Sequence, residues 1–600
     1  MLRPGAGETR RAQVLLSARS RWHRWIAPLT IVALLSPMLF TDRTFGTDWA
    51  NHLWLVWNQG ISIHDLGHPS YFLQSTLGAF YPFYAFYGGS LYAATGLGSD
   101  LAGDPIVAFV GSYAVGATMA YGGLLWLARQ AGVRGWQAHM PAVLFVTSAY
   151  YVTNIYGRGA WPETMATSAL PLVLAAAVSI LSGPRPTVRA AAALVLGVAL
   201  LSGSHNITLL WSATALVALA AVAAGTGWRR AIPPRRLAVL GGLSLLGLGV
   251  NLWFLLPDLA YAGRVRIAPY TGIGGTNLDG FSTVFGLLRD NQPEPNIPTT
   301  TINPQTPVLA LVWAAAGCAL SWRVLDRAWH RLIAGVAVVA AALTALILLD
   351  VPRAVVPDLW GHVQFGFRLQ TYVTLIVCLL VIAALRGVRG LAPGRRVDVL
   401  AALGSIVVIS VAQALDQAWS KSSTLGSRSD AVTVAYQTPP SWYAGLDYSD
   451  ASLPVLGPDQ LLAVPGLTVT GFRGNQTLSI PVTRRPQVSA YTFSFPSPGA
   501  GAVATNIPAG PYLVGVHGAS AVGRTFDGLL AIGTPPLPGT PTRVTFGTAG
   551  NWAVRLGQVG SLLSLALAAA GLVAVLGRRR RGLAAALSGL RRRPPPGSRP

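Results

Sequence analysis

Long apolar runs follow one another along this chain, and arginine gathers at alternate ends of them. Arg129 and Arg134 separate two of the runs, and further arginine clusters lie within 229–236, 386–396 and 578–581. A helix needs about 20 consecutive apolar residues to cross a bilayer, and basic residues are retained in cytoplasmic loops. The pattern therefore predicts a polytopic membrane protein whose arginine-rich connections are cytoplasmic and whose longer connections lie on the outer face.

The composition favours a membrane protein over a soluble one. The 600 residues are 52% hydrophobic and 11% charged, whereas soluble domains carry about 25% charged residues. In a soluble chain the net charge of +23 would suggest a nucleic-acid partner, but here the arginines lie in short loops between apolar runs. We therefore expect membrane lipids as partners and no nucleic acid.

The motifs for nucleotide and metal chemistry do not occur in this sequence. It contains no GxxxxGK phosphate loop followed by Ser or Thr, no HExxH and no CxxC, so an ATP-driven mechanism is not indicated. Cys318 and Cys378 both lie inside apolar runs, where cysteine behaves as a small hydrophobic residue.

The runs predict an α-helical architecture of about twelve spans. Residues 1–24 form a basic cytoplasmic segment, and an uncleaved first span follows it. Residues 25–415 form the transmembrane domain, with outer loops at 42–103, 257–307 and 350–363. Residues 552–577 form a last span and 578–600 a basic tail, so both termini are expected in the cytoplasm, and the bias toward Ala, Gly and Arg indicates a bacterial plasma membrane. The expected spans centre on Leu34, Val115, Leu144, Leu174, Leu196, Thr214, Leu246, Trp313, Val338, Ile376, Val407 and Leu565.

Between residues 416 and 551 the hydrophobic period changes to two. Alternating apolar residues occur at 467–469, 478–482 and 491–495, and turn residues such as those at 473–475 and 496–499 separate these runs. Short alternating runs between turns are typical of antiparallel strands. We expect a small β-sandwich domain here, on the outer face.

A few polar residues fall at the outer ends of the spans, and the first of them are Asp48 and His52. If the segment from Trp49 is helical, the two side chains share a face, four residues apart. A carboxylate beside an imidazole can accept a proton from a hydroxyl or bind a divalent cation. The alternative is that Asp48 only caps the helix that begins at Trp49.

A second group surrounds Arg158, which stands between Gly157 and Gly159 with Glu163 five residues on. The flanking glycines would let the backbone approach a bound group closely, and a guanidinium suits a phosphate or carboxylate. An Arg158–Glu163 ion pair that fixes the loop is an equally weighted interpretation, and both can hold.

Four further polar residues lie at outer span ends. His205 stands in a short turn, where a structural role is favoured. Asp258 ends a span beside Pro257, and a capping or loop role has the same weight there as any other role. His362 and Arg368 open the tenth span. A charge just inside the membrane boundary is costly and usually functional or paired, so we favour a lipid phosphate as the ligand of Arg368 over snorkelling to the interface.

Together these segments resemble bacterial membrane proteins of the GT-C glycosyltransferase superfamily, in the branch called YfhO-like or pyruvoyl-tetrahydropterin-synthase-related. The match rests on Asp48 to Leu53, on Tyr156 to Glu163, which looks like an RGA-x-x-E segment, and on Val363 to Arg368, which looks like a Q-F-x-x-R segment with Gly366 in place of Pro. The Ser204-His205-Asn206 turn also fits. One acid stands at Thr47-Asp48, where the superfamily often has two.

The resemblance implies sugar transfer from a polyprenyl-phosphate donor to an envelope glycan or lipid acceptor at the outer face. It implies that Asp48 is the catalytic base with His52 beside it, and that Arg158, Glu163, His205, His362 and Arg368 surround the substrates. No cofactor is certain, and a divalent cation stays open. Two other classes remain as alternatives: a transporter or flippase of a lipid-linked glycan, and a non-catalytic scaffold for envelope assembly.

Overall fold

The computed structural model describes the chain from Trp22 to Arg591 except for a set of gaps. These gaps are residues 44, 46–47, 72, 75–79, 82, 184–185, 226–231, 262–292, 295–296, 302–307, 349–365, 421–468, 474–475, 481–482, 487–489, 500, 509–521, 525–528 and 549. His362 and the outer loop 350–363 therefore lie outside the described residues, as does most of the loop 257–307.

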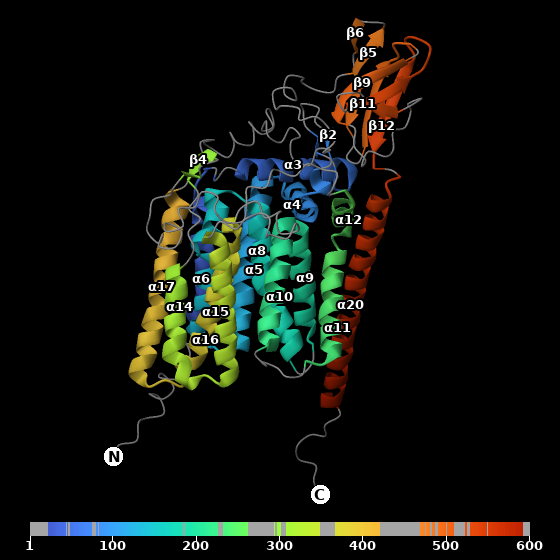
Figure 1. Ribbon diagram of the computed structural model, residues 1–600. Helices are drawn as coiled ribbons and strands as arrows, with labels where there is room; N and C mark the ends of the chain where they lie inside the picture. Colours follow the sequence, from blue (N-terminus) through green and yellow to red (C-terminus); the bar gives the residue numbers. More distant parts are fainter. Residues whose placement is uncertain are drawn as a thin grey trace, which may run out of the picture.

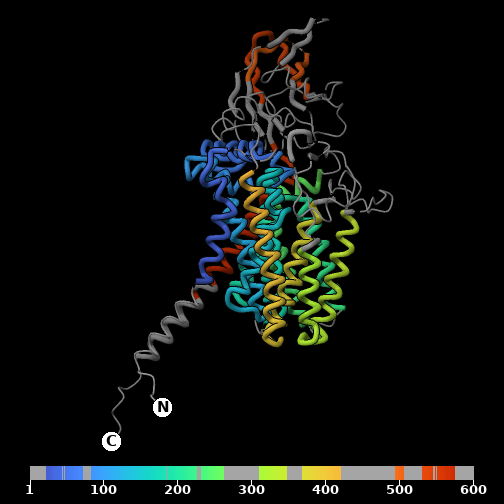
Figure 2. Tube along the Cα trace, turned by 90° about the vertical axis from the view of Figure 1, so that its left-hand side faces the viewer, coloured from blue at the N-terminus to red at the C-terminus, as the bar shows by residue number. Residues whose placement is uncertain are grey.

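Most described residues belong to helices that stand side by side, with one helix, α3, lying across their upper ends (Figures 1 and 2). The helices are α2 (Ile26–Phe40), α3 (Trp49–Leu66), α4 (Gly89–Ala102), α5 (Pro105–Gln130), α6 (Met140–Val146), α7 (Ala149–Val152), α8 (Trp161–Ser182), α9 (Val188–Ser204), α10 (Asn206–Gly225), α11 (Pro234–Gly249), α12 (Leu252–Tyr261), α14 (Val308–Ser321), α15 (Arg327–Leu348), α16 (Gln370–Val388), α17 (Pro393–Ser420) and α20 (Trp552–Arg591). The short helical turns are η1 (Trp22–Trp25), η2 (Phe83–Ala85), η3 (Gly135–His139), η4 (Thr153–Gly157), η6 (Trp322–Val324) and η9 (Gly366–Leu369).

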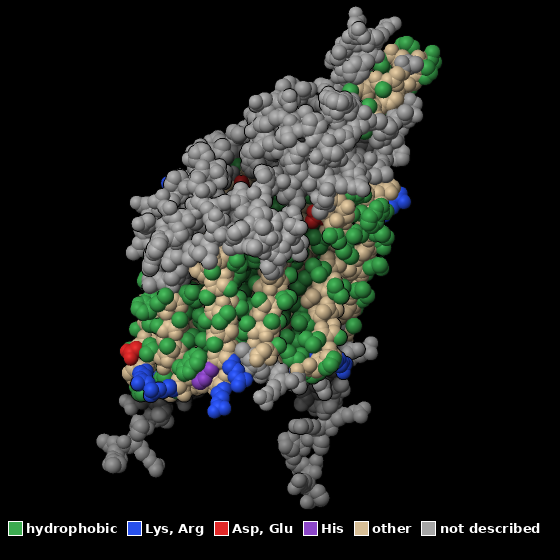
Figure 3. All heavy atoms as spheres, viewed as in Figure 1, with side chains coloured by type: hydrophobic (Ala, Val, Ile, Leu, Met, Phe, Trp, Pro, Cys, Tyr) green, Lys and Arg blue, Asp and Glu red, His purple; other side chains and the backbone are tan. Residues whose placement is uncertain are grey.

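The outer surface of this bundle is apolar along its middle. Val217, Leu245 and Val338 lie within their helices and are 68–69% exposed, and hydrophobic side chains cover the middle of the bundle in Figure 3. Arginine side chains gather at its lower end in the same view. We call this lower end, with Arg129, Arg236 and Arg386, the arginine-rich end, and the end covered by α3 the site end. An apolar band of this kind is the surface of a membrane protein.

Among the described residues, eight helices are long and apolar enough to cross a membrane, or nine if the bent pair α11 and α12 counts as one span. The other expected spans coincide with helices that fall short of this length. α9 has 17 residues and α14 has 14, and the third expected span is divided into α6, α7 and η4. Each of the twelve expected centres lies in a helix, and the count of about twelve crossings stays a prediction.

Helices α16 and α8 are the most enclosed of the candidate spans. Of the most apolar window of α16, 89% is buried, and for α8 the share is 67%, against 11% for α20. Helices α5 and α8 approach closely because α5 has Gly123 at the contact: a Cβ there would lie 2.5 Å from the backbone of Pro171 and Leu172. Small residues allow such close approach between membrane helices, and this contact fixes the position of α8.

Two antiparallel sheets lie beyond the site end (Figure 1). One has the order β10-β11-β9-β5-β6 and the other β12-β8-β7. Their strands are β5 (Val469–Arg473), β6 (Gln476–Ile480), β7 (Thr483–Pro486), β8 (Ala490–Pro496), β9 (Gly501–Pro508), β10 (Val522–Arg524), β11 (Leu529–Thr534) and β12 (Pro541–Gly547). Two smaller antiparallel pairs join β1 (Leu73–Gln74) to β2 (Phe80–Tyr81) and β3 (Pro293–Glu294) to β4 (Ile297–Thr301). The period-two runs were thus correctly interpreted as strands, and the sandwich arrangement stays a prediction.

Candidate active site

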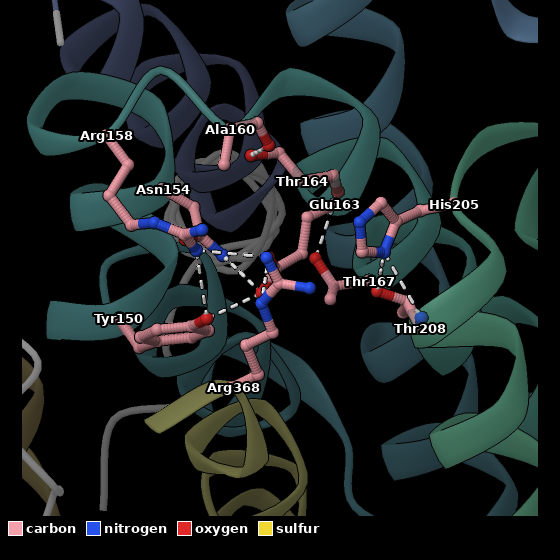
Figure 4. A network of polar contacts seen from close by, with 10 residues as sticks. All are labelled: Tyr150, Asn154, Arg158, Ala160, Glu163, Thr164, Thr167, His205, Thr208 and Arg368. Atoms are coloured by element: carbon pink, nitrogen blue, oxygen red, sulfur yellow. Dashed lines mark hydrogen bonds and ion pairs between the residues drawn. The ribbon is translucent and has the colours of Figure 1, made fainter. Parts of the chain in front are cut away.

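Glu163 forms the centre of a buried polar cluster at the site end. It lies in the first turn of α8 and is 2% exposed. Arg158 Nη1 lies 3.0 Å from its Oε2, and Arg368 Nε lies 3.4 Å from the same oxygen. Tyr150 donates its hydroxyl to Oε1 over 2.5 Å, and Asn154 Nδ2 lies 3.4 Å from Oε1. Figure 4 shows both guanidinium groups directed toward Glu163.

A π-helical turn, η4, sets the direction of Arg158. The turn covers Thr153–Gly157, and the Arg158 amide donates to the Thr153 carbonyl over 2.8 Å. π-helical turns of this kind often occur at functional sites. The wide turn brings Arg158 beside Asn154, whose Oδ1 accepts from Arg158 Nη1 at 3.0 Å.

Arg368 reaches the same carboxylate from the opposite part of the chain. It lies in η9, directly before α16, and its side chain is 10% exposed. The hydroxyl of Tyr372, on α16, donates to the Thr208 carbonyl over 3.2 Å and lies 3.1 Å from Ser212 Oγ. These bonds tie α16 to α10, which follows His205. A side chain this enclosed does not snorkel to the interface, and the structure instead pairs Arg368 with Glu163.

The charges of this cluster explain why Arg158 stays protonated. Burial alone would lower the pKa of Arg158, but the Glu163 carboxylate, with Tyr150 and Asp48 nearby, raises the pKa above its ordinary value. Arg158 is therefore always cationic. Breaking a buried ion pair by removing one partner is costly because it leaves an uncompensated charge, so Glu163 and its two cations act as one unit.

Asp48 lies directly beside Arg158. The Asp48 amide donates to the Arg158 carbonyl over 2.9 Å. Gly159 has φ +70°, and a Cβ there would lie 2.6 Å from the Trp49 amide nitrogen. The sequence suggested that Gly159 leaves room for a bound group. In the structure, the space left by its absent side chain is occupied by the start of α3 instead. Asp48 is the N-cap residue of α3, yet its side chain makes no capping bond, which removes the reason to interpret it as a cap.

His52 follows one turn into α3 and is neutral. It is 4% exposed, and its Nδ1 lies 2.6 Å from the Tyr92 hydroxyl. Burial, together with the positive charge of Arg158, lowers the pKa of His52 to about 3. The neutral ring can therefore take part in hydrogen bonds and orient a hydroxyl at neutral pH, but it contributes no positive charge.

His205 occupies the turn between α9 and α10 and is also neutral. The Thr208 amide donates to its Nδ1 over 3.2 Å, so the neutral ring carries its proton on Nε2. Burial and the charge of Arg368 lower the pKa of His205 to about 3. The ring of Tyr87 meets it edge to face at 5.5 Å between centroids.

The rest of this turn fastens neighbouring segments to the site. Asn206 Nδ2 donates to the Phe86 carbonyl over 3.0 Å and to Asp258 Oδ2 over 2.6 Å. Asp258 is thus a hydrogen-bond partner of Asn206, the residue that follows His205 in the chain. The structure consequently gathers six of the eight polar residues around one point and places Asp258 at its edge, while His362 lies outside the described residues.

Four residues of the cluster were not found by sequence reasoning. Tyr150 and Asn154 contact Glu163, but nothing in their sequence surroundings marks them as polar partners. Neither Tyr87 nor Tyr92 was assigned a role from the sequence. Burial raises the pKa of Tyr87, and the charges of Arg368, Asp48, Glu163 and Arg158 also act on it, which places this phenol among the charged groups.

In the part of the chain that the structure describes, no three His, Cys, Asp or Glu side chains are close enough to hold a metal ion. The described groups offer a carboxylate in Asp48, a neutral imidazole in His52, and positive charge in Arg158 and Arg368.

Comparison with known proteins gave matches among solved structures only. No protein-family model matches the chain, and no curated protein matches it. The arabinofuranosyltransferase AftD from Mycobacteria is 18% identical with a TM-score of 0.42, over 66% of this chain and 26% of its own length. The oligosaccharyltransferase of Archaeoglobus fulgidus is 14% identical with a TM-score of 0.38, over 66% of this chain and 55% of its own.

A further structure shows the archaeal enzyme AglB from Archaeoglobus fulgidus with an inhibitory peptide and a dolichol-phosphate. It is 16% identical with a TM-score of 0.39, over 70% of this chain and 58% of its own length. The chain thus spans about a quarter of AftD and rather more than half of the archaeal protein. At TM-scores below 0.5, the function has to be argued from the residues of the site.

Proposed function

We propose that this chain is an integral membrane glycosyltransferase of the GT-C type. It transfers a sugar from a polyprenyl-phosphate donor to an envelope glycan or lipid acceptor, with inversion at the anomeric carbon. The site end faces outward and the arginine-rich end faces the cytoplasm of a bacterial cell. The resemblance of three short segments to the YfhO-like branch supports the same assignment.

One observation carries this proposal. Two guanidinium groups share one buried carboxylate at the site end, and Asp48, whose side chain does not cap its helix, is close enough for its charge to act on Arg158. Charge at the end of a membrane bundle is costly, and two cations gathered around Glu163 fit the binding of an anionic lipid head group.

The charges of the cluster match the charges of the reaction. Asp48 accepts the proton of the acceptor hydroxyl, whose oxygen then attacks the anomeric carbon. The bond from this carbon to the phosphate oxygen breaks, and its electron pair remains on the phosphate. As Asp48 becomes neutral, the cluster of Asp48, Arg158, Glu163 and Arg368 changes from no net charge to one positive charge, at the moment when the phosphate gains negative charge. Positive charge placed where negative charge develops is usually the largest catalytic contribution.

His52 and Tyr92 are suited to position the acceptor. The neutral imidazole is held by the Tyr92 hydroxyl at 2.6 Å, one helical turn after Asp48. A neutral donor and acceptor pair can orient a sugar hydroxyl without competing for the phosphate.

The variant Asp48→Asn tests the proposal. The chain and its variants are expressed in a strain that lacks it, and envelope glycans and lipid-linked sugars are measured. We expect Asp48→Asn to lower transfer at least about 100-fold, the usual effect of removing a general base, and to cause lipid-linked donor to accumulate while expression stays normal.

A matched control is Asp104→Asn at the same end of the bundle. Asp104 caps α5 by accepting from the amides of Ile106 and Val107, and asparagine caps equally well, so transfer should be unchanged. Normal transfer by well-expressed Asp48→Asn would overturn the catalytic assignment and leave transport or a scaffolding role.

A further inference from the structure

A cavity of about 460 Å³ lies in the other half of the membrane domain, between α5, α8, α9, α10, α11, α15 and α16. Its walls are mainly apolar. They include Val173, Ala177, Leu216, Ile333 and Leu379. A cavity with walls of this kind has few partners for water and binds apolar molecules instead.

The cavity is separate from the site around Glu163, and its depth is about the thickness of one leaflet. Along α8 its lining runs from Val173 to Ser182, which is about 14 Å at 1.5 Å per residue. Half of a hydrocarbon core is about 15 Å thick. Leu181, another lining residue, lies about 27 Å along α8 from Glu163. The depth matches one acyl chain that enters from the arginine-rich end.

The mouth of the cavity is basic, whereas its walls are mainly apolar. Arg386, in the last turn of α16, is the charged residue among the described lining residues. Its Nη1 donates to the Ala131 carbonyl over 2.7 Å, and its guanidinium lies 5.1 Å from the ring centroid of Trp329. Arg236 lies at the same mouth and donates to the carbonyl of Leu181 over 2.8 Å.

We propose that this cavity binds one acyl chain of an anionic phospholipid from the leaflet at the arginine-rich end, with the lipid phosphate at Arg386. Basic pockets between membrane helices bind anionic head groups, and a guanidinium matches a phosphate in geometry. The apolar walls, the depth of one leaflet and the cationic mouth together select this ligand. The proposal does not depend on the function proposed for the site end.

The test measures lipid binding directly. The purified full chain is stripped of lipid with detergent and then offered phosphatidylglycerol or phosphatidylcholine with identical acyl chains. Native mass spectrometry counts the bound lipid. We expect one tightly bound lipid, with phosphatidylglycerol preferred about tenfold, because the choline cation of phosphatidylcholine offsets the phosphate charge that Arg386 attracts.

Two variants address the two parts of the cavity. Arg386→Gln should retain an acyl chain but bring the preference for phosphatidylglycerol to within about twofold. Ala177→Trp should fill the cavity and remove tight binding of both lipids. The matched controls are Arg389→Gln, an exposed arginine at the same helix end, and Ala569→Trp, on the exposed surface of α20. Both controls should bind like the unaltered chain.

Two results would overturn the proposal. If Ala177→Trp still binds the lipid tightly, the acyl chain does not occupy this cavity. If Arg386→Gln keeps the full preference for phosphatidylglycerol, then Arg386 only caps the end of α5. A melting temperature for each variant shows whether it is folded, and the Arg386→Gln comparison does not require filling the cavity.

Discussion

At the scale of single residues, Glu163 is the link between the two cations of the site. Arg158 comes from a turn before α8, and Arg368 comes from η9, more than 200 positions later in the chain. Both guanidinium groups meet at one carboxylate oxygen. This oxygen holds the two positive charges at a fixed separation, on which the proposed binding of a phosphate depends.

The variant Glu163→Gln tests this role. It keeps the shape of the side chain but leaves two buried guanidinium groups without their anion, and breaking a buried ion pair costs about 3–5 kcal/mol. We expect a clear fall in the melting temperature of the purified protein.

The control is Asp100→Asn, which removes the ion pair between His64 and Asp100 at 2.9 Å. The side chain of His64 is 75% exposed, and exposed pairs contribute about 0–1 kcal/mol. Equal melting temperatures for the two variants would contradict the role given to Glu163.

At the scale of elements, the contact between α3 and the turn after η4 brings Asp48 to the site. Helix α3 lies across the upper ends of the spans and not through the membrane. Its first residue, Trp49, rests on Gly159, and the Asp48 amide is bonded to Arg158. The position of the proposed base thus depends on one residue without a side chain.

The variant Gly159→Ala should disturb this contact. A residue other than glycine at positive φ costs about 1–2 kcal/mol, and the added Cβ would also press on the backbone of α3, which adds about 1–3 kcal/mol. We expect lower stability and loss of transfer, measured by thermal unfolding and by the glycan assay.

Gly103→Ala separates the two causes. Gly103 has φ +68°, but nothing lies within 4 Å of a Cβ there. The stability of this variant should fall only by the cost of the positive φ, about 1–2 kcal/mol, and its activity should be unchanged. If it loses as much activity as Gly159→Ala, the contact with α3 is not what positions Asp48.

At the scale of the whole molecule, the two ends of the bundle carry different chemistry. The site end holds buried and mutually paired charges, and the arginine-rich end holds exposed basic residues. Helices α8 and α16 connect them through the most enclosed part of the bundle. The direction of the protein in the membrane therefore decides which compartment contains the reaction.

Labelling of introduced cysteines tests this direction. Leu101, at the end of α4, is 79% exposed at the site end, and Trp136, in η3, is 41% exposed at the opposite end. The native Cys318 and Cys378 are buried. In intact cells, an impermeant thiol reagent should label Leu101→Cys, and should label Trp136→Cys only after lysis. The reverse pattern would place the site in the cytoplasm and remove the proposed donor and acceptor.

Much of this architecture follows from local patterns in the chain. Long apolar runs must form helices in a bilayer, because unpaired backbone groups are too costly there, and each of the twelve expected centres lies in a helix. Alternating residues near 469, 478 and 491 form strands because only a period of two places them on one face. Asp48, His52, Arg158 and Glu163 were also recognisable, because polar residues at span ends stand out from apolar surroundings.

Tertiary structure alone decided which of these residues meet. The pairing of Arg368 with Glu163 joins segments about 200 residues apart, and the contributions of Tyr150 and Asn154 depend on a π-helical turn that no residue pattern signals. The neutral state of His52 and His205 arises from burial and from neighbouring charges. The apolar cavity arises where seven helices pack imperfectly. Local sequence determines what each segment forms, whereas contacts between distant segments depend on how all the side chains pack at once.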